Sequence, residues 1–361
     1  MDAILERLQS QGISVFLESY SALDRYFGVK EPGSVHFLTD ASLISLAKAF
    51  DDIEFAGFPF EDASVVHTGQ RYSFRCVDSI AESPPYPYTA QHLIYNPGRG
   101  SFFDPEGIYH DLRAKQLVNS DRPISIWLAV MEAAKMVARY HYEIELPLAI
   151  NGLDDFEPAA EMQRELLVSL LSSRYSDQGL DLLYRTGFVE RFWPELYDMA
   201  SAKHTKEYHP EGDVWEHTLE TLKHRKNTDL TLSMALLLHD IGKPVSERLK
   251  DKPFKDHAEL GVRIGSSFLR YLGFDARFIH DVGFLVRNHM IPAALGRLPL
   301  YRTERLMDSE LFPKLLELYR ADISSTYSRP GGYYEACRIY KMYMKKRSNP
   351  YVRLSRSRRI G

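Results

Sequence analysis

A buried helix that ends in two metal-type side chains constrains this chain more than any other feature. Residues 230–240 are apolar nearly all round, as in a helix at the centre of a core, and they end in His239 and Asp240. Gly242 and Lys243 follow at once. Burying an imidazole and a carboxylate among leucines costs free energy unless a partner satisfies them. A divalent cation is such a partner, so we expect the fold to bring further ligands to this helix end.

Candidate ligands lie on other segments with a helical period. His217 precedes the helix, and His257 and His289 follow it, each beside apolar residues that recur every three or four positions. Imidazole and carboxylate ligands together suit Mn, Fe, Co, Ni or Zn, and Mg where carboxylates dominate. Any one buried histidine has a simpler explanation as a packed core residue. The joint pattern favours a metal, although packing stays open for His257 and His289.

Asp322 is the last candidate ligand. Leu315, Leu318 and Tyr319 precede it by seven, four and three positions, so the carboxylate lies on the apolar stripe of a predicted helix. A carboxylate on a buried face needs a partner. We therefore expect Asp322 to reach the same site.

The order of these residues, H…HD…H…H…D, resembles the HD superfamily of metal-dependent phosphohydrolases. The resemblance implies one metal held by His217, His239, Asp240 and Asp322. It implies that His257 and His289 contact phosphate or a second metal, although members with two metals often carry a histidine pair where this chain has one. It also implies that Asp240 orients or deprotonates a water and that Lys243 contacts phosphate, with an ordinary solvated lysine as the alternative.

Composition places the chain among ordinary globular proteins. Its 361 residues suggest two or three domains, and 44% hydrophobic with 26% charged residues is typical of such proteins. The net charge of −4 predicts no overall attraction to nucleic acid or membrane. Two cysteines, Cys76 and Cys337, exclude a disulfide framework, and we expect a cytoplasmic protein without a signal segment.

The first 118 residues differ from the rest. Short β-rich runs alternate with turns there, which predicts a small mixed α/β unit with strands near 34–38, 64–67, 72–77 and 92–95. Beyond about residue 122 the helical period dominates, with helices expected at 127–139, 161–172 and 177–184.

Three sequence segments resemble the bacterial tRNA nucleotidyltransferase and poly(A) polymerase family. They are the stretches 102–112 (F-F-D-P-E-G-I-Y-H-D-L), 182–196 (L-L-Y-R-T-G-F-V-E-R-F-W-P-E-L) and 209–219 (H-P-E-G-D-V-W-E-H-T-L). The resemblance implies an α+β fold: a small nucleotidyltransferase-like mixed sheet, then an all-α neck and an all-α HD domain. The expected segments are a head at 1–118, a neck at 119–200, the HD domain at 201–330 and a basic tail at 331–361.

The head departs from that family where nucleotide and metals would bind. Residues 19–24 (S-Y-S-A-L-D) occupy the position of the family's G-G-x-V-R-D motif and match it only at Asp24. Ser34 and His36 occupy the positions of the paired carboxylates in the family's D-x-D motif. Pro85-Tyr86-Pro87 replaces the family's R-R-D segment, whereas Asp40 is retained. Two-metal transfer needs acidic oxygens to hold the ions, so we expect no nucleotide addition. The head is expected to persist as a scaffold or an RNA-docking surface.

Two features could serve RNA in that case. Four aromatic residues of the head could stack bases or simply pack in the core: Tyr86, Tyr88, Phe102 and Phe103. From Lys341 to Gly361 there are eight lysines or arginines and no acid, which predicts either a phosphate-binding arm or a solvated terminus.

The leading expectation is a metal-dependent HD phosphohydrolase that acts on a nucleotide or an RNA-end phosphoester. One alternative is a non-catalytic tRNA- or RNA-binding relative with a structural metal. A second alternative is an active tRNA CCA-adding nucleotidyltransferase.

Overall fold

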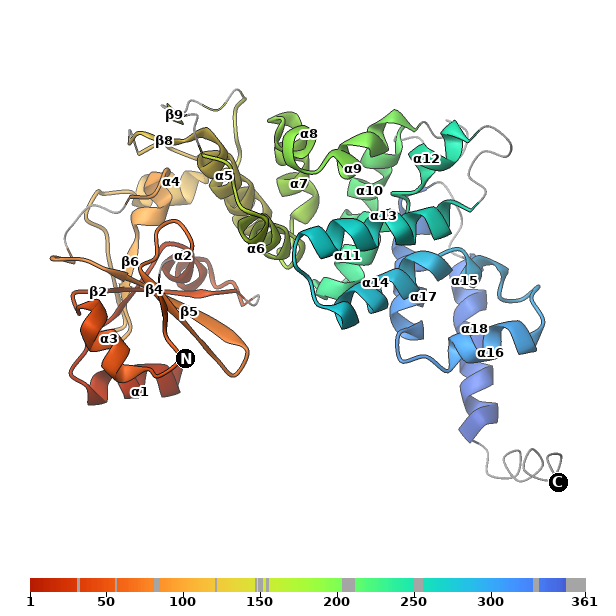
Figure 1. The fold of residues 1–361 in the computed structure, drawn as a ribbon, viewed down its shortest axis with the longest axis horizontal. Helices are drawn as coiled ribbons and strands as arrows, with labels where there is room; N and C mark the ends of the chain where they lie inside the picture. Colours follow the sequence, from red (N-terminus) through yellow and green to blue (C-terminus); the bar gives the residue numbers. More distant parts are fainter. Residues whose placement is uncertain are drawn as a thin grey trace. The chain divides into compact units, whose positions relative to one another are not determined.

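The computed structural model describes the whole chain apart from residues 31–32, 56, 81–84, 121, 147, 149–151, 154–155, 203–211, 250–255, 327–330 and 349–361. It divides into two compact units, Met1–Tyr175 and Ser176–Gly361, which are described separately (Figure 1). In the described part, no helix is both long and apolar enough to cross a membrane.

The first unit is built on a seven-stranded mixed sheet in the order β3-β4-β5-β2-β1-β6-β7. The strands are β1 (Phe16–Glu18), β2 (Val35–Thr39), β3 (Glu54–Phe55), β4 (Ala63–His67), β5 (Gln70–Cys76), β6 (Ile94–Asn96) and β7 (Ser101–Phe103). Only β2 and β5 pair in parallel; the other neighbours are antiparallel. A separate short pair joins β8 (Ile124–Ser125) to β9 (Gly152–Leu153).

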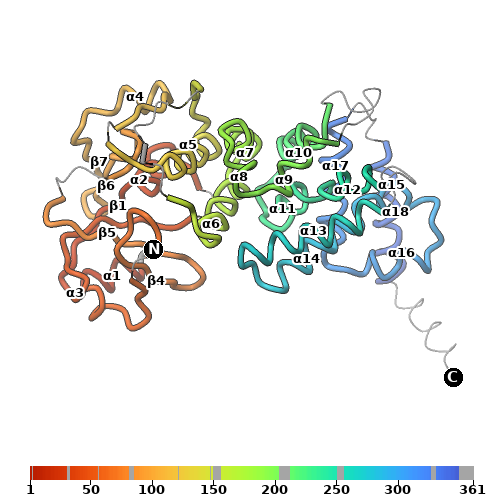
Figure 2. Tube along the Cα trace, turned by 45° about the horizontal axis from the view of Figure 1, so that its top comes forward, coloured from red at the N-terminus to blue at the C-terminus, as the bar shows by residue number. Residues whose placement is uncertain are grey.

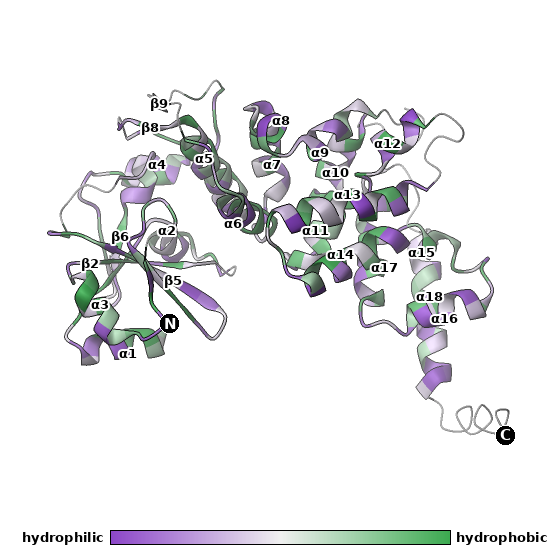
Figure 3. Ribbon diagram, in the orientation of Figure 1, coloured by the Kyte–Doolittle hydropathy of each residue, from purple (hydrophilic) through white to green (hydrophobic). Residues whose placement is uncertain are grey.

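Helices accompany this sheet in the first unit. They are α1 (Asp2–Ser10), α2 (Ser19–Phe27), α3 (Leu43–Ala49), the 3-10 helix η1 (Thr89–His92), α4 (Tyr109–Ala114), α5 (Ile126–Tyr140) and α6 (Ala160–Leu171). Helix α5 is buried along most of its length, and Figure 3 shows it predominantly hydrophobic. Three charged side chains nevertheless project from α5: Lys135 pairs with Glu132 on the same helix, while Glu132 also contacts Tyr20 and Arg139 pairs with Asp24, both on α2.

The second unit is entirely helical in its described residues. Its elements are α7 (Ser176–Arg185), α8 (Phe188–Phe192), α9 (Pro194–Tyr197), η2 (Asp198–Ser201), α10 (Val214–Lys223), α11 (Leu230–Leu238), α12 (Lys243–Arg248), α13 (His257–Tyr271), α14 (Ala276–Asn288), α15 (Ile291–Ala294), α16 (Leu300–Met307), α17 (Phe312–Ser324) and α18 (Gly331–Ser348). Helix α11 packs against α10, α14 and α17, so it lies at the centre of the unit (Figure 2).

Glycines allow the turn after α11 to approach α13 closely. A Cβ atom on Gly242 would lie 2.1 Å from the carbonyl oxygen of His257 and 2.6 Å from the amide nitrogen of Gly261. Both atoms belong to backbone, which cannot move aside without shifting the helix. Gly242 therefore fixes the distance between the α11 terminus and the start of α13, where His257 lies.

The predicted fold class is confirmed: a mixed sheet in the first part of the chain is followed by helices. The helices expected at 127–139, 161–172 and 177–184 correspond to α5, α6 and α7. The four expected strands correspond to β2, β4, β5 and β6, except that His92 falls in the 3-10 helix η1 before β6. The four-segment domain division stays a prediction; the two compact units divide within the predicted neck.

Candidate metal centre

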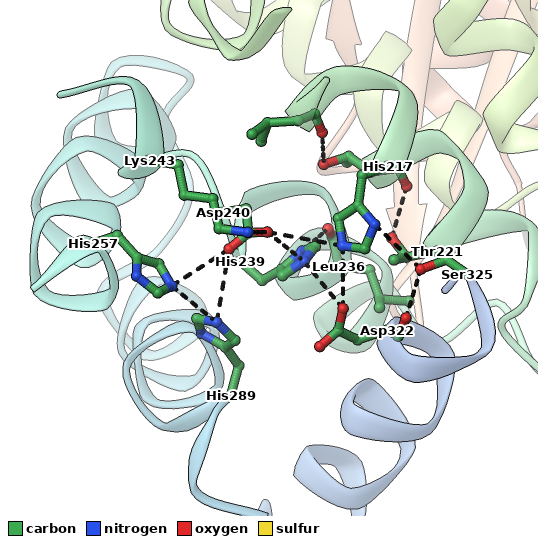
Figure 4. Close-up of polar contacts among 12 residues, drawn as sticks. His217, Thr221, Leu236, His239, Asp240, Lys243, His257, His289, Asp322 and Ser325 are labelled. Atoms are coloured by element: carbon green, nitrogen blue, oxygen red, sulfur yellow. Dashed lines mark hydrogen bonds and ion pairs between the residues drawn. The ribbon is translucent and has the colours of Figure 1, made fainter. Parts of the chain in front are cut away.

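Five helices of the second unit bring the predicted ligands together (Figure 4). His217 lies within α10, and His239 and Asp240 follow directly after α11. His257 begins α13, His289 follows α14, and Asp322 lies near the end of α17. Residues up to 105 positions apart in the sequence come into contact in this way, because several of these helices pack against the central helix α11.

The first half of the centre joins His217, His239 and Asp322. His217 Nε2 lies 3.1 Å from Asp322 Oδ1 and 3.8 Å from Asp240 Oδ2. His239 Nε2 lies 3.2 Å from Asp240 Oδ2 and 4.0 Å from Asp322 Oδ1. His217, His239 and Asp240 each offer a ligand atom within 4.8 Å of the others.

The second half uses the other oxygen of Asp240. Asp240 Oδ1 lies 3.5 Å from His257 Nε2 and 3.7 Å from His289 Nε2. These three residues form a second group whose ligand atoms lie within 4.8 Å of one another. The single carboxylate of Asp240 is thus shared between two potential cation positions.

Backbone and hydroxyl partners orient the imidazoles. Nδ1 of His239 donates to the carbonyl oxygen of Leu236 at 2.8 Å, and Nδ1 of His289 donates to that of Val286 at 2.7 Å. His217 Nδ1 lies 3.3 Å from the hydroxyl of Ser325. A histidine that donates from Nδ1 leaves Nε2 unprotonated when neutral, which is the form that binds a metal.

The donor set fits a metal ion. His239 and Asp240 are only 1% and 2% exposed, and among the described residues His239 Nε2 and Asp240 Oδ1 have no hydrogen-bond partner. Leaving buried polar atoms unpaired costs about 1–3 kcal/mol each. A cation between these atoms would remove that cost, and the mixture of nitrogen and oxygen ligands suits the transition metals and Mg named above.

Electrostatics keep these ligands in their binding forms. Burial raises the pKa of Asp240, but His239, Lys243 and His289 outweigh it and hold that pKa well below its usual range. Burial lowers the pKa of His289 to about 4. The carboxylate is therefore ionised and the imidazole neutral at pH 7, as metal binding requires. The ammonium of Lys243 lies 2.6 Å from Asp240 Oδ2, so in this structure it pairs with the carboxylate.

The head contains no comparable cluster in its described residues. His36 Nδ1 lies 2.8 Å from the hydroxyl of Ser73, and Asp24 accepts two hydrogen bonds of 2.6 Å from Arg139. Ser34 is partly buried just before β2, and Asp40 is exposed just after it. None of these residues joins a group of three ligands.

Other polar residues of the first unit were missed by sequence reasoning. Glu18 at the end of β1 accepts hydrogen bonds from Arg75 on β5, at 3.0 Å from Nε and 2.7 Å from Nη2. Glu132 accepts hydrogen bonds from Tyr20 and Gln91. A charged residue inside an otherwise apolar strand or helix is the signal that could have revealed them, as it did for Asp322.

Among the four aromatic residues considered for base stacking, Tyr86 and Tyr88 are buried in the core, at 3% and 4% exposure. Phe102 packs edge-on against Tyr26, and Phe103 is 46% exposed. Only Phe103 therefore offers a large free surface.

Comparisons with known proteins show a domain match over part of the chain and several named relatives. Residues 214–323 match the HD domain family, and all six candidate ligands lie within this range. This part of the chain is thus similar to an HD domain. The CC-adding tRNA nucleotidyltransferase of Thermus thermophilus is 33% identical over 177 residues, covering 47% of this chain and 40% of that protein. The A-adding tRNA nucleotidyltransferase of Deinococcus radiodurans is 28% identical over 259 residues, covering 65% of this chain and 58% of that protein.

A solved structure shows the same fold. The CCA-adding enzyme of Bacillus stearothermophilus in complex with CTP superposes with a TM-score of 0.53 at 16% identity, covering 94% of this chain and 81% of that one. The chain is thus similar in sequence to tRNA nucleotidyltransferases over 47% to 65% of its length, and residues 214–323 match the HD domain. The aligned parts span about 40% to 58% of the two curated relatives named above.

These relatives correct the predicted function. The expectation of a phosphohydrolase is wrong, and so is the class of hydrolase that went with it, because the relatives are named tRNA nucleotidyltransferases. An HD ligand set specifies a place for a metal and does not by itself specify hydrolysis. The expectation that nucleotidyl transfer is absent is also wrong on the same comparison. Ser34 and His36 exclude one arrangement of carboxylates, which is a narrower conclusion than excluding the reaction.

Proposed function

We propose that this chain is a tRNA nucleotidyltransferase, which joins nucleotides to the 3′ end of tRNA. The observation that carries the proposal is the 33% identity to a relative named for adding CC to tRNA. A second relative is named for adding A. The shared order of a mixed-sheet head and an all-helical HD unit agrees with this reaction.

Nucleotide addition requires the protein to neutralise negative charge on the reacting phosphates. The terminal hydroxyl of the tRNA attacks the α-phosphorus of a nucleoside triphosphate, the bond to the β-phosphate oxygen breaks, and pyrophosphate leaves with the electron pair. Negative charge on the phosphates must be neutralised during this exchange. Divalent ions supply that charge in two-metal transferases. In the described head, however, no three such side chains lie close enough together to hold an ion.

We further propose that the centre in the second unit holds a divalent metal, with Mn, Fe, Co, Ni, Zn and Mg as candidates. The proposed ligands are His217, His239, Asp240 and Asp322. His257 and His289 would contact a second metal or a phosphate. The roles suggested for Asp240 in activating water and for Lys243 in contacting phosphate depended on hydrolysis, and they are not part of this proposal.

We also propose that the basic end of the chain contacts RNA. The described part of that end is the last turns of α18, where Lys341, Lys345 and Lys346 are exposed. Arg347 pairs with Asp308 at 2.9 Å. The remainder of the predicted arm, residues 349–361, lies outside the described residues. The cytoplasmic location predicted above from the cysteine content is consistent with a tRNA substrate.

Incorporation of labelled nucleotide tests the function. The full chain is incubated with CTP or ATP and with tRNA that ends before CCA or after CC. We expect label in the tRNA at a level well above that of a mock purification. tRNA binding without incorporation would contradict the proposed reaction and would make the chain a tRNA-binding relative, an outcome that the paired acids of the head would explain.

A further inference from the structure

A hydroxyl group at the end of α17 connects two of the proposed metal ligands. Ser325 directly follows α17 and is buried, at 7% exposure. Its Oγ lies 3.3 Å from Nδ1 of His217 on α10 and 2.5 Å from the backbone carbonyl oxygen of Asp322 (Figure 4). Ser325 therefore bridges two helices that each carry one ligand.

The hydrogen bonds of this hydroxyl can be assigned from its chemistry. A serine hydroxyl has one proton to donate and lone pairs with which to accept, whereas a carbonyl oxygen can only accept. The 2.5 Å contact with the carbonyl oxygen of Asp322 therefore uses the proton of Ser325. The hydroxyl oxygen can then accept a hydrogen bond from Nδ1 of His217.

The histidines at the ends of α11 and α14 orient their rings in a different way. Nδ1 of His239 donates to the carbonyl oxygen of Leu236, and Nδ1 of His289 donates to that of Val286. Each of these acceptors lies three residues earlier in the same stretch of chain. Ser325, by contrast, contacts His217 from a different helix, so it links the orientation of that ring to the position of α17.

Two positions for the proton of a neutral His217 compete in this arrangement. Nε2 lies 3.1 Å from Oδ1 of Asp322, so a proton on Nε2 would donate to that carboxylate. A proton on Nδ1 would instead donate to Ser325 and leave the lone pair of Nε2 to bind a metal. Because the hydroxyl proton of Ser325 is directed at a carbonyl oxygen, the hydroxyl presents a lone pair to Nδ1 and favours the second position.

We propose that Ser325 is a positioning residue of the metal centre, which holds His217 with its proton on Nδ1 and with Nε2 directed at the metal. Ser325 acts through His217 and does not contact the ion. The inference rests on the metal centre proposed above and adds to it a residue that the ligand pattern does not contain. Residues that support a metal ligand in this way typically change metal affinity by about 10- to 100-fold when they are replaced.

Metal titration of the full chain tests this role. Zn²⁺ and Mn²⁺ are titrated by calorimetry into metal-free protein carrying Ser325→Ala, which removes the hydroxyl, or Ser325→Thr, which retains it. Ser324→Ala is the matched control. That neighbouring serine is exposed, and its hydroxyl donates to the carbonyl oxygen of Arg320 at 2.6 Å.

A magnetic resonance measurement reports directly on the hydrogen bond. In Zn²⁺-loaded protein labelled with ¹⁵N in the histidine rings, we expect one Nδ1 proton signal that is lost in His217→Ala. The same signal should move upfield in Ser325→Ala, because its acceptor is gone, and stay in place in Ser324→Ala. A general weakening of the end of α17 would not single out this proton.

We expect Ser325→Ala to bind both metals at least about tenfold more weakly, and both Ser325→Thr and Ser324→Ala to bind them as the wild type does. Wild-type affinity in Ser325→Ala, equal loss in Ser325→Thr, or an unmoved His217 signal would overturn the positioning role and leave the metal centre in place. A wild-type chain that binds neither metal would remove the centre and this role together.

Discussion

The Nε2 atoms of His257 and His289 lie 3.2 Å apart, and both lie within 3.7 Å of the same oxygen of Asp240. His289 donates from Nδ1 to the backbone, so its Nε2 is an acceptor when the ring is neutral. A proton on His257 Nε2 or a bound cation must therefore lie between the two rings. The close approach of three ligand atoms at one point is the geometry that a metal would satisfy.

Removing a central ligand should remove the metal. We expect His239→Ala to lower the affinity for Mn²⁺ by more than about 100-fold, since substitutions of residues that merely support a metal ligand already cost 10- to 100-fold. Calorimetric titration of the metal-free chain measures the change. His280→Ala is the control, because that side chain is 76% exposed on α14 and lies outside the cluster. Equal Mn²⁺ affinity in the wild type and His239→Ala would show that the cluster is not a metal site.

Adding one methyl group at Gly242 should destabilise the second unit. The new Cβ would lie 2.1 Å from the carbonyl oxygen of His257, and overpacking of this kind costs about 1–3 kcal/mol. Urea unfolding of Gly242→Ala should show the loss. Gly283→Ala on α14 is the matched control, since its Cβ would meet Val262 at an ordinary 3.6 Å. A Gly242→Ala chain as stable as the wild type would mean that the turn can move away from α13.

His36 should make the head less stable in acid. Burial lowers its pKa to about 3 in the folded chain, against 6.5 for an ordinary histidine, so below pH 6.5 the unfolded chain binds a proton that the folded chain does not. Stability therefore falls as the pH drops from 6.5 toward 3, by about 2 kcal/mol at pH 5 from this residue. His36→Asn should flatten that part of the pH profile in urea unfolding. An unchanged slope between pH 6.5 and 5 would contradict the assignment.

Breaking the buried pair between Glu18 and Arg75 should cost more than replacing it. Arg75→Met leaves a carboxylate that is 1% exposed without its cation, a change that costs about 3–5 kcal/mol in buried pairs. The double variant Glu18→Leu with Arg75→Met removes both charges, so it should recover much of that loss. Chemical unfolding of the three proteins compares them. A double variant that is less stable than Arg75→Met would show that the pair itself stabilises the head.

The sequence predicted the second unit better than the first. Residues 230–240 predicted a core helix because they are apolar nearly all round. Asp322 was predicted as a ligand because the helical period placed its carboxylate on a buried face. Both inferences use spacing within one helix, which sequence shows directly. The pairing of Glu18 with Arg75 or of Asp24 with Arg139 depends on strand order and on contacts between distant segments, which spacing does not contain. The function was mispredicted for a related reason: a metal-ligand pattern describes a place for an ion, and the reaction depends on what else the chain binds.

The central claim is that this chain adds nucleotides to tRNA, and sequencing the 3′ ends of the product tests it most directly. A tRNA that lacks CCA and one that ends in CC are incubated separately with the full chain and with CTP and ATP together, and each terminus is then read. The account predicts new C residues, new A residues or both at the 3′ end of at least one of these tRNAs, and none after incubation with a mock purification. Termini identical to the starting tRNAs, under conditions in which the chain is folded and binds tRNA, would contradict it.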